Sequence, residues 1–407
     1  MFHRFLRART VARATLFGLG MLATLSCLKP AGIRYPNLPE TKDGALHIIA
    51  FNVGQADATL VLYRGKSLLI DCGASLKDPA KASQVIPRRL DALLGSRHID
   101  YFLVTHYHQD HFGSPGHRQA QHEPSGLFGL IENDGVTIGT VLDRGFDSVT
   151  TKGSSHKSYE RAIGAWIASG VVGARRELHA GDTVDMGPGL EIRVVAAAAN
   201  GYLDRLHTLY PSWIEENPPS ENDYSIGIKL TLGDFEMFTA GDLSGYNVVR
   251  RFGNNSQSYN DIESQVAGTV GAVEVYRVNH HGSENSSNPC FTEVLRPLVS
   301  IFSTGTNGYG HPAVEVYHRL KNYGQVYITG GAAPAVRAEV ADDIVGDDID
   351  VVVAPDGKRF WANGTAFQSL SDAEEAARPG ARDTCRPPEV SDVKPSEFRK
   401  VEDTTGD

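Results

Sequence analysis

The sequence predicts one α/β domain between residues 46 and 365, in which helices cover β-sheets. Short apolar segments typical of strands recur along this whole region, and segments with helical spacing lie between them. No stretch inside it has the composition of a linker. We therefore expect a single domain rather than two.

The elements follow from the spacing of apolar residues. Apolar or alternating segments predict strands at residues 46–51, 58–63, 67–70, 101–104, 183–185, 190–195, 225–232, 235–239, 273–278, 299–303, 326–329, 349–353 and 359–361. Apolar residues on one helical face predict helices at residues 87–94, 159–169 and 314–323. Residues 113–135, rich in Gly, Pro and His, are expected to form a loop with one short helix at most.

The two ends of the chain are expected to lie outside the fold. Residues 1–27 have arginines, then an apolar run, then small residues, as an export signal does. Cys27 is a candidate for lipidation and membrane attachment, with plain secretion or a retained anchor as the alternative. Residues 28–45 predict a linker, and residues 366–407 are charged and Pro-rich, which predicts disorder. We expect an extracytoplasmic protein, periplasmic or secreted.

Charge and cysteine content narrow the class of protein. The net charge of −10 provides no general attraction to nucleic acid or anionic membrane, so no stable nucleic-acid partner is expected. Beyond Cys27 there are only Cys72, Cys290 and Cys385, too few and too scattered for a disulfide framework or a zinc knuckle. The sequence leaves open whether Cys290 and Cys385 form a disulfide.

A group of metal-binding residue types follows the predicted strand at residues 101–104. His106 and His108 are two residues apart, so in extended chain they face the same way and can bind one metal ion. Asp110 and His111, just beyond, can bind a second. Imidazole and carboxylate suit zinc, and also manganese or iron. Two such ions would share a hydroxide that acts as a nucleophile near neutral pH. The alternative, a polar loop with incidental histidines, does not explain this pattern.

This His-x-His-x-Asp-His pattern resembles the signature of the metallo-β-lactamase superfamily. With the other motifs, the chain resembles the hydrolase domain of ComEC-type competence proteins and their secreted stand-alone relatives. The other motifs are, in order, Phe51-Asn52-Val53-Gly54-Gln55-Ala56-Asp57-Ala58, Leu69-Ile70-Asp71-Cys72-Gly73, Ala180-Gly181-Asp182, Glu221-Asn222-Asp223-Tyr224-Ser225, Thr239-Ala240-Gly241-Asp242, Asn279-His280-His281-Gly282-Ser283 and Tyr309-Gly310-His311-Pro312. The resemblance implies an αββα four-layer sandwich.

The resemblance also implies roles for individual residues. It implies two divalent metal ions, with zinc favoured and manganese as the alternative. Asp242 matches the carboxylate that bridges them, and His280 or His281 matches a late histidine on the second ion. We favour His280, which lies nearer the predicted strand end. Asp71 matches a buried carboxylate that orients ligands from behind.

One position departs from the family pattern. Many members have a further histidine between the cluster and the bridging aspartate, but residues 221–225 contain only Asn222 and Asp223 as polar candidates near the expected place. The remaining ligand of the first ion is therefore unassigned. Asp57 and Ser283 are further candidates for the site, with a turn cap and a polar turn as their alternatives.

These observations predict an exported metal-dependent hydrolase. Asp110 would be both a ligand and a catalytic carboxylate, and His311 would donate a proton to the leaving group or contact a phosphate oxygen. By resemblance the preferred substrate is a small or short phosphodiester. The alternatives are an ester, lactone or lactam hydrolase on the same site, or a metal-binding surface module without catalysis.

Overall fold

The computed structural model of this 407-residue chain describes residues 44–73, 81–116, 123–146, 153–378, 385 and 389–402. The expected export signal, Cys27 and nearly all of the linker lie outside these residues. Every described residue belongs to one compact unit, which begins at Leu38. No helix in the described ranges is long and apolar enough to cross a membrane.

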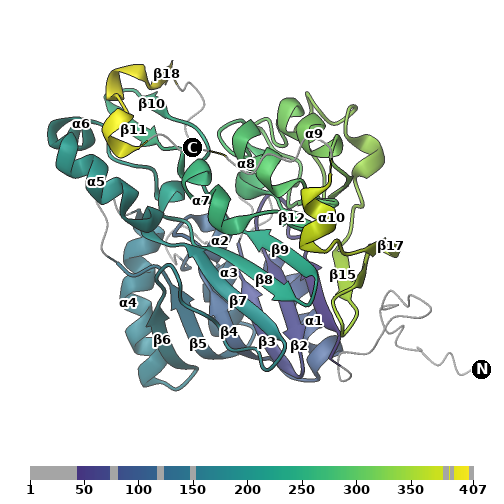
Figure 1. The fold of residues 1–407 in the computed structure, drawn as a ribbon. Coiled ribbons are helices and arrows are strands. Elements are labelled where there is room, and N and C mark those ends of the chain that lie inside the picture. Colours follow the sequence, from purple (N-terminus) through teal and green to yellow (C-terminus); the bar gives the residue numbers. More distant parts are fainter. Residues whose placement is uncertain are drawn as a thin grey trace, which may run out of the picture. The chain divides into compact units, whose positions relative to one another are not determined.

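Two large sheets form the centre of this unit (Figure 1). The nine-stranded sheet has the order β17 (Thr365–Gln368), β16 (Arg359–Ala362), β15 (Ile349–Val353), β1 (Leu46–Ala50), β2 (Thr59–Tyr63), β3 (Lys66–Ile70), β4 (His98–Leu103), β5 (Thr137–Asp143) and β6 (Val172–Glu177). The six-stranded sheet has the order β14 (Gln325–Ile328), β13 (Val299–Phe302), β12 (Val275–Arg277), β9 (Phe235–Thr239), β8 (Gly227–Leu232) and β7 (Leu190–Ala196).

The apolar side chains of the two sheets share one core. Val61 and Leu103 from the first sheet and Ile228 and Val275 from the second belong to the same buried cluster. On β8, buried Ile228, Leu230 and Leu232 alternate with partly exposed residues, as expected for a strand with one face turned to a core. The hydrophobic effect therefore holds the sheets face to face.

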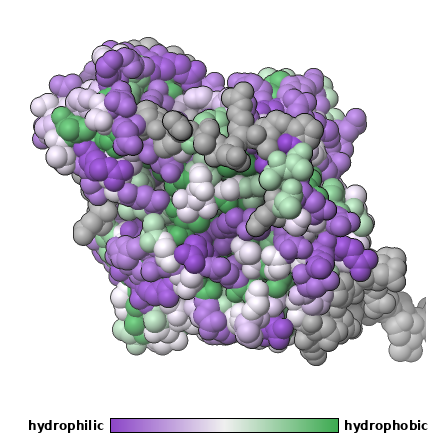
Figure 2. All heavy atoms as spheres, viewed as in Figure 1, coloured by the Kyte–Doolittle hydropathy of each residue, from purple (hydrophilic) through white to green (hydrophobic). Residues whose placement is uncertain are grey.

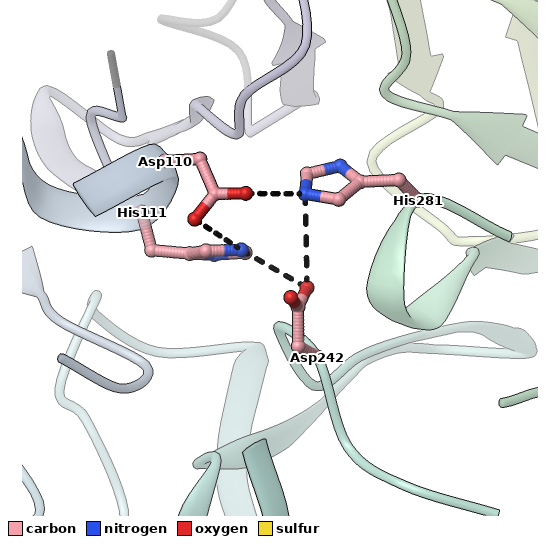
Figure 3. Close-up of side chains that lie close together, drawn as sticks. All are labelled: Asp110, His111, Asp242 and His281. Carbon is pink, nitrogen blue, oxygen red and sulfur yellow. Dashed lines mark hydrogen bonds and ion pairs between the residues drawn. The ribbon is translucent and has the colours of Figure 1, made fainter. Parts of the chain in front are cut away.

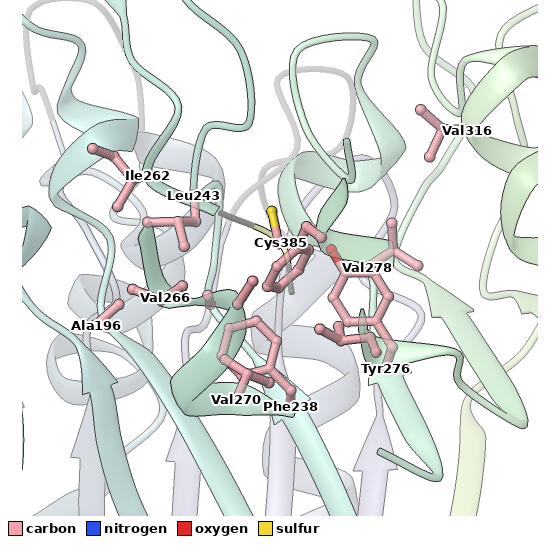
Figure 4. Close-up of a cluster of buried hydrophobic side chains, with 14 of the residues drawn as sticks. Ala196, Phe238, Leu243, Ile262, Val266, Val270, Tyr276, Val278, Val316 and Cys385 are labelled. Carbon is pink, nitrogen blue, oxygen red and sulfur yellow. The ribbon is translucent and has the colours of Figure 1, made fainter. Parts of the chain in front are cut away.

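Helices cover the outer face of each sheet. The helices that pack on the nine-stranded sheet are α1 (Lys81–Leu94), α3 (Gly126–Glu132) and α4 (Ser154–Ala168). Those on the six-stranded sheet are α5 (Tyr202–Leu209), α7 (Ile262–Val270), α8 (Pro289–Leu295) and α9 (Val314–Lys321). Figure 4 shows the second of these cores, where Val266 and Val270 of α7 lie beside Phe238 of β9 and Tyr276 of β12. The predicted α/β, αββα architecture is confirmed.

A small third sheet and the C-terminal segment were not anticipated. β11 (Asn255–Tyr259), β10 (Val248–Phe252) and β18 (Arg399–Glu402) form this sheet. The disorder predicted for residues 366–407 is wrong for α10 (Asp372–Ala376) and for the segment that ends in β18. Cys385 forms a disulfide with Cys290, and buried Phe398 packs on Trp213. The disulfide and a few buried apolar side chains therefore hold this polar segment on the domain.

Smaller differences have local causes. α1 begins at Lys81 and contains Pro87, at which the helix was expected to begin. β6 lacks an apolar pattern because it is an edge strand with largely exposed side chains. Residues 183–185 contribute only an isolated bridge, Thr183 with Arg193. The shorter elements are α2 (Gln109–Phe112), α6 (Pro211–Glu216) and the turns η3 (Ala198–Gly201), η4 (Glu221–Tyr224), η5 (Asn279–Gly282), η6 (Ala341–Asp343), η7 (Val390–Asp392) and η8 (Pro395–Glu397).

The visible surface of the molecule is mostly polar. On the face drawn in Figure 2, hydrophilic residues cover most of the molecule and hydrophobic residues are scattered in small groups.

Candidate metal centre

The carboxyl ends of three strands meet at one place. The histidine cluster follows β4, Asp242 follows β9, and His280 and His281 follow β12. β9 and β12 are parallel neighbours, so their carboxyl ends lie side by side, and the His280 amide donates to the Gly241 carbonyl at 2.9 Å. The Ile226 amide donates to the Thr105 carbonyl at 2.9 Å and joins the two sheets at this point.

Four side chains form the first group of potential ligands (Figure 3). His111 Nε2 lies 2.9 Å from Asp242 Oδ1, and His281 Nε2 lies 3.2 Å from Asp110 Oδ2. His281 Nε2 is also 3.9 Å from Asp242 Oδ1. Their ligand atoms all lie within 4.8 Å of one another. Two imidazoles and two carboxylates thus face a common point.

His106, His108 and Asp242 form the second group. His106 Nε2 lies 3.1 Å from His108 Nδ1 and 3.9 Å from Asp242 Oδ2. Asp242 therefore turns one oxygen toward each group. This arrangement is what a carboxylate that bridges two ions requires.

Three histidine rings form hydrogen bonds through their Nδ1 atoms, so that their Nε2 atoms face the metal centre. His111 Nδ1 donates to Asp71 at 2.8 Å, and His281 Nδ1 donates to the Ser303 carbonyl at 2.8 Å. The Thr105 hydroxyl donates to Asp71 at 2.7 Å, so its oxygen accepts from His106 Nδ1 at 3.2 Å. Metal-binding histidines are commonly oriented in this way.

The donor set fits divalent metal ions. His111 Nε2 and Asp242 Oδ1 are buried, and neither makes a hydrogen bond of acceptable geometry to a described residue. The separations of 2.9–3.2 Å between neighbouring ligand atoms approach the roughly 3.3 Å edge of a tetrahedron around zinc. Nitrogen and carboxylate oxygen are also the donors that zinc and manganese accept.

Burial and neighbouring charge shift the pKa values in this centre. Burial, followed by the neighbouring His111 and His108, holds the pKa of His106 well below its ordinary value, so this imidazole is neutral, as a ligand must be. Burial alone would raise the pKa of Asp242, but His111 and the late histidines lower it well below the usual range. Asp242 is therefore ionised.

A third group of potential ligands, Asp57, Asp71 and His111, shares His111 with the first group. Asp57 and Asp71 both approach His111 Nδ1, at 3.8 and 2.8 Å. The guanidinium of Arg277 contacts Asp57, so a cation from the protein already pairs with that carboxylate. Burial lowers the pKa of Arg277 to about 9. Asp57 therefore supports the centre from behind.

Arg277 was missed from the sequence, although a signal existed. It is a charged residue inside the apolar strand at residues 273–278, two positions before the histidine-containing turn. A fully buried arginine needs a charged partner, because an unpaired buried charge is costly.

The structure brings a different late histidine from the favoured His280 to the first group. His281, not His280, joins Asp110 and His111. Both histidines have left-handed backbone, with φ of 50° and 53°, so η5 turns sharply between them. His280 Nε2 instead lies 3.6 Å from Asp242 Oδ2, the oxygen that also faces His106.

The two residues at the place of the missing histidine diverge. Asn222 Nδ2 donates to the His280 ring at 3.3 Å, beside the second group. Asp223 turns away and accepts hydrogen bonds from Asn260 at 2.7 and 3.1 Å, and burial raises its pKa to about 7. A tight turn, with Ser220 as its N-cap, sends these neighbouring side chains in different directions.

A cavity of about 410 Å³ adjoins the centre and is lined by His280, Ser283 and His311. His311 Nδ1 accepts from Gln55 Nε2 at 3.3 Å, and the Gly305 amide donates to Gln55 Oε1 at 3.2 Å, which defines the amide orientation. Burial, followed by His280 and His281, holds the pKa of His311 well below its ordinary value. Neutral His311 therefore carries its proton on Nε2.

The fold is an αββα sandwich of the metallo-β-lactamase type, and the comparison with known proteins agrees with this resemblance. The family described as the metallo-beta-lactamase superfamily matches residues 51–116, which include the histidine cluster. The resemblance inferred from the motifs is confirmed.

The chain is similar to ComE operon protein 3 of Bacillus subtilis (strain 168), with 24% identity over 303 residues, 71% of this chain and 32% of that protein. It is 21% identical to Recombination protein 2 of Haemophilus influenzae over 72% of this chain and 28% of that protein. It thus spans about a third of the length of these relatives. Among solved structures, the metallo-beta-lactamase fold protein YhfI from Bacillus subtilis is similar, with 11% identity, a TM-score of 0.39, and coverage of 70% of this chain and 96% of that chain.

Proposed function

We propose that this protein is an exported metal-dependent hydrolase that cleaves small or short phosphodiesters. The observation that carries the proposal is the single carboxylate, Asp242, which presents one oxygen to each of two groups of potential ligands. Structural sites are usually closed by four protein ligands, whereas this centre adjoins a cavity.

The two ions would share Asp242 and would otherwise be held by different residues. Asp110, His111, His281 and Asp242 would hold one, and His106, His108 and Asp242 would hold the other. His280, 3.6 Å from Asp242 Oδ2, would supply the nitrogen that the absent middle histidine supplies in many relatives. When bound, the two ions would activate water and polarise the scissile bond.

The chain's own groups would orient the substrate. His311 presents an Nε2 proton and would donate it in a hydrogen bond to an oxygen of the substrate. Ser283 lines the same cavity and is a second donor. Such preorganised donors stabilise negative charge that develops on a phosphoryl oxygen.

The extracytoplasmic location is part of this proposal. The composition of residues 1–27 and the disulfide between Cys290 and Cys385 support it, because disulfides persist in oxidising compartments. Cell fractionation of the wild type and of Cys27→Ala tests export and anchoring separately.

Elemental analysis combined with hydrolysis tests the catalytic proposal. Purified protein with zinc or manganese is expected to bind two ions and hydrolyse bis(p-nitrophenyl) phosphate. Chelation and His108→Ala should abolish this activity, whereas His179→Ala, which changes an exposed histidine, should not.

Other outcomes would support the alternatives. Activity that survives chelation or His108→Ala would contradict the mechanism. Hydrolysis only of carboxylic esters, lactones or lactams would indicate that these compounds, and not phosphodiesters, are the substrate class. Two bound ions with no activity on any substrate would indicate a metal-binding surface module.

A further inference from the structure

The cavity beside the metal centre also contains a cation that the metal chemistry does not use. Arg250 on β10 and Tyr259 on β11 line the same cavity as His280 and His311. Both strands belong to the three-stranded sheet, outside the two sheets of the sandwich. We infer that Arg250 binds a second anionic group of the substrate, a phosphate next to the scissile one. This inference rests on the proposed function.

The size of the cavity is suitable. Its volume of about 410 Å³ falls within the range of small-molecule sites, roughly 300–1,000 Å³. A lone phosphate group would leave most of this space empty. A substrate that continues beyond the scissile bond would fill it.

Arg250 is held in place before any ligand binds. β10 pairs with β11 on one side and with β18 on the other, so its backbone is fixed along both edges. The guanidinium lies 5.7 Å from the centre of the Tyr259 ring, and its side chain is only 18% exposed. A planar guanidinium binds phosphate through paired hydrogen bonds, and its fixed position reduces the entropy lost on binding.

The acidic neighbours of Arg250 do not prevent this role. Glu284 lies 3.3 Å from Arg250 and 3.7 Å from Arg399, so two arginines share one carboxylate. Glu284 is 46% exposed, and exposed ion pairs contribute little. Glu284 can therefore give way to a phosphate. Glu315 also lines the cavity. Its negative charge is opposite to the positive charge of the ions that the metal centre would hold.

Tyr309 provides a surface for the uncharged part of the substrate. It lines the cavity, is 47% exposed, and its ring lies 5.9 Å from that of His311. An aromatic ring at such a place stacks with a flat group such as a nucleobase. Together these features favour a short oligonucleotide with an additional terminal phosphate over an isolated diester.

The experiment compares the dinucleotide TpT with its phosphorylated forms pTpT and TpTp, using the full metal-loaded protein. The wild type should have a kcat/KM at least 10-fold higher for one phosphorylated form than for TpT. Arg250→Gln should remove this preference and leave hydrolysis of TpT within about 3-fold. Arg251→Gln is the matched control, because this exposed neighbour lies on the opposite face of β10 and should retain the preference.

Three results would overturn the inference: no preference in the wild type, an equal loss on all three dinucleotides in Arg250→Gln, or faster hydrolysis of p-nitrophenyl phosphocholine, whose second group is a cation. If no diester is hydrolysed, the proposed function fails instead. Calorimetric binding of pTpT, TpTp and TpT to the wild type and both variants then tests Arg250 independently. Equal affinity for all three would overturn its role, and thermal melting would verify that Arg250→Gln is folded.

Discussion

Asp71 accepts a hydrogen bond of 2.8 Å from His111 Nδ1, and its other oxygen accepts one of 2.9 Å from the Thr105 amide. Asp71 is buried, and its two oxygens accept hydrogen bonds from Thr105 and from the side of His111 that faces away from Asp242. It therefore determines which nitrogen of His111 carries the proton without being a ligand itself.

Asp71→Asn should weaken metal binding. The amide can turn its NH₂ group toward His111 and favour the wrong tautomer, so we expect about a 10–100-fold loss in metal affinity or activity. Metal titration and hydrolysis measure both effects. Asp100→Asn is a suitable control, because Asp100 accepts two hydrogen bonds from Ser67 away from the centre. Unchanged metal affinity in Asp71→Asn would contradict this role.

The two late histidines should have separable effects. His281→Ala should lose the ion held with Asp110 and His111, because His281 is the ligand candidate closest to Asp110. His280→Ala should instead weaken the ion held by His106 and His108. Elemental analysis of each variant should approach one ion per chain, and metal titration of a His281→Ala/His280→Ala double variant should show both losses. Full occupancy in His281→Ala would disprove the assignment.

The disulfide should stabilise the C-terminal segment. Cys290 and Cys385 are 95 residues apart, and closing so long a loop in the unfolded chain stabilises a protein by about 2–5 kcal/mol. Replacing both by serine should lower the free energy of unfolding by that amount in urea. Wild-type protein with reductant should unfold at the same midpoint as the variant. An unchanged midpoint in both would indicate that apolar contacts alone hold the segment.

Glu274 should make stability depend on pH. Burial raises its pKa from 4.5 to about 7, against the hydrogen bonds it accepts from the Leu370 and Glu236 amides. The unfolded chain releases this proton near pH 4.5 and the folded chain only near 7. The stabilisation is therefore complete below pH 4.5 and is lost as the pH rises to about 7.

Glu274→Gln removes this titration. The stability of the wild type relative to the variant should fall by about 2–3 kcal/mol between pH 4.5 and 8. Urea unfolding of both proteins across that interval measures the difference. A constant difference would show that folding does not raise the pKa of Glu274.

The sequence by itself determined the fold class and most of the metal-binding residue types. The apolar segments predicted the strands because burial imposes their pattern, and His106, His108, Asp110 and His111 are local in sequence, so strand geometry alone groups them. The motifs around Asp71 and Asp242 added distant members through resemblance.

Only the tertiary structure decided which side chains meet. His281 rather than His280 reaches Asp110, because the left-handed turn between them is a backbone feature that residue spacing does not encode. Arg277 beneath Asp57, and Arg250 beside the cavity, come from strands that are far from the cluster in sequence. The C-terminal segment is ordered by the disulfide and a few buried residues, which a polar composition conceals.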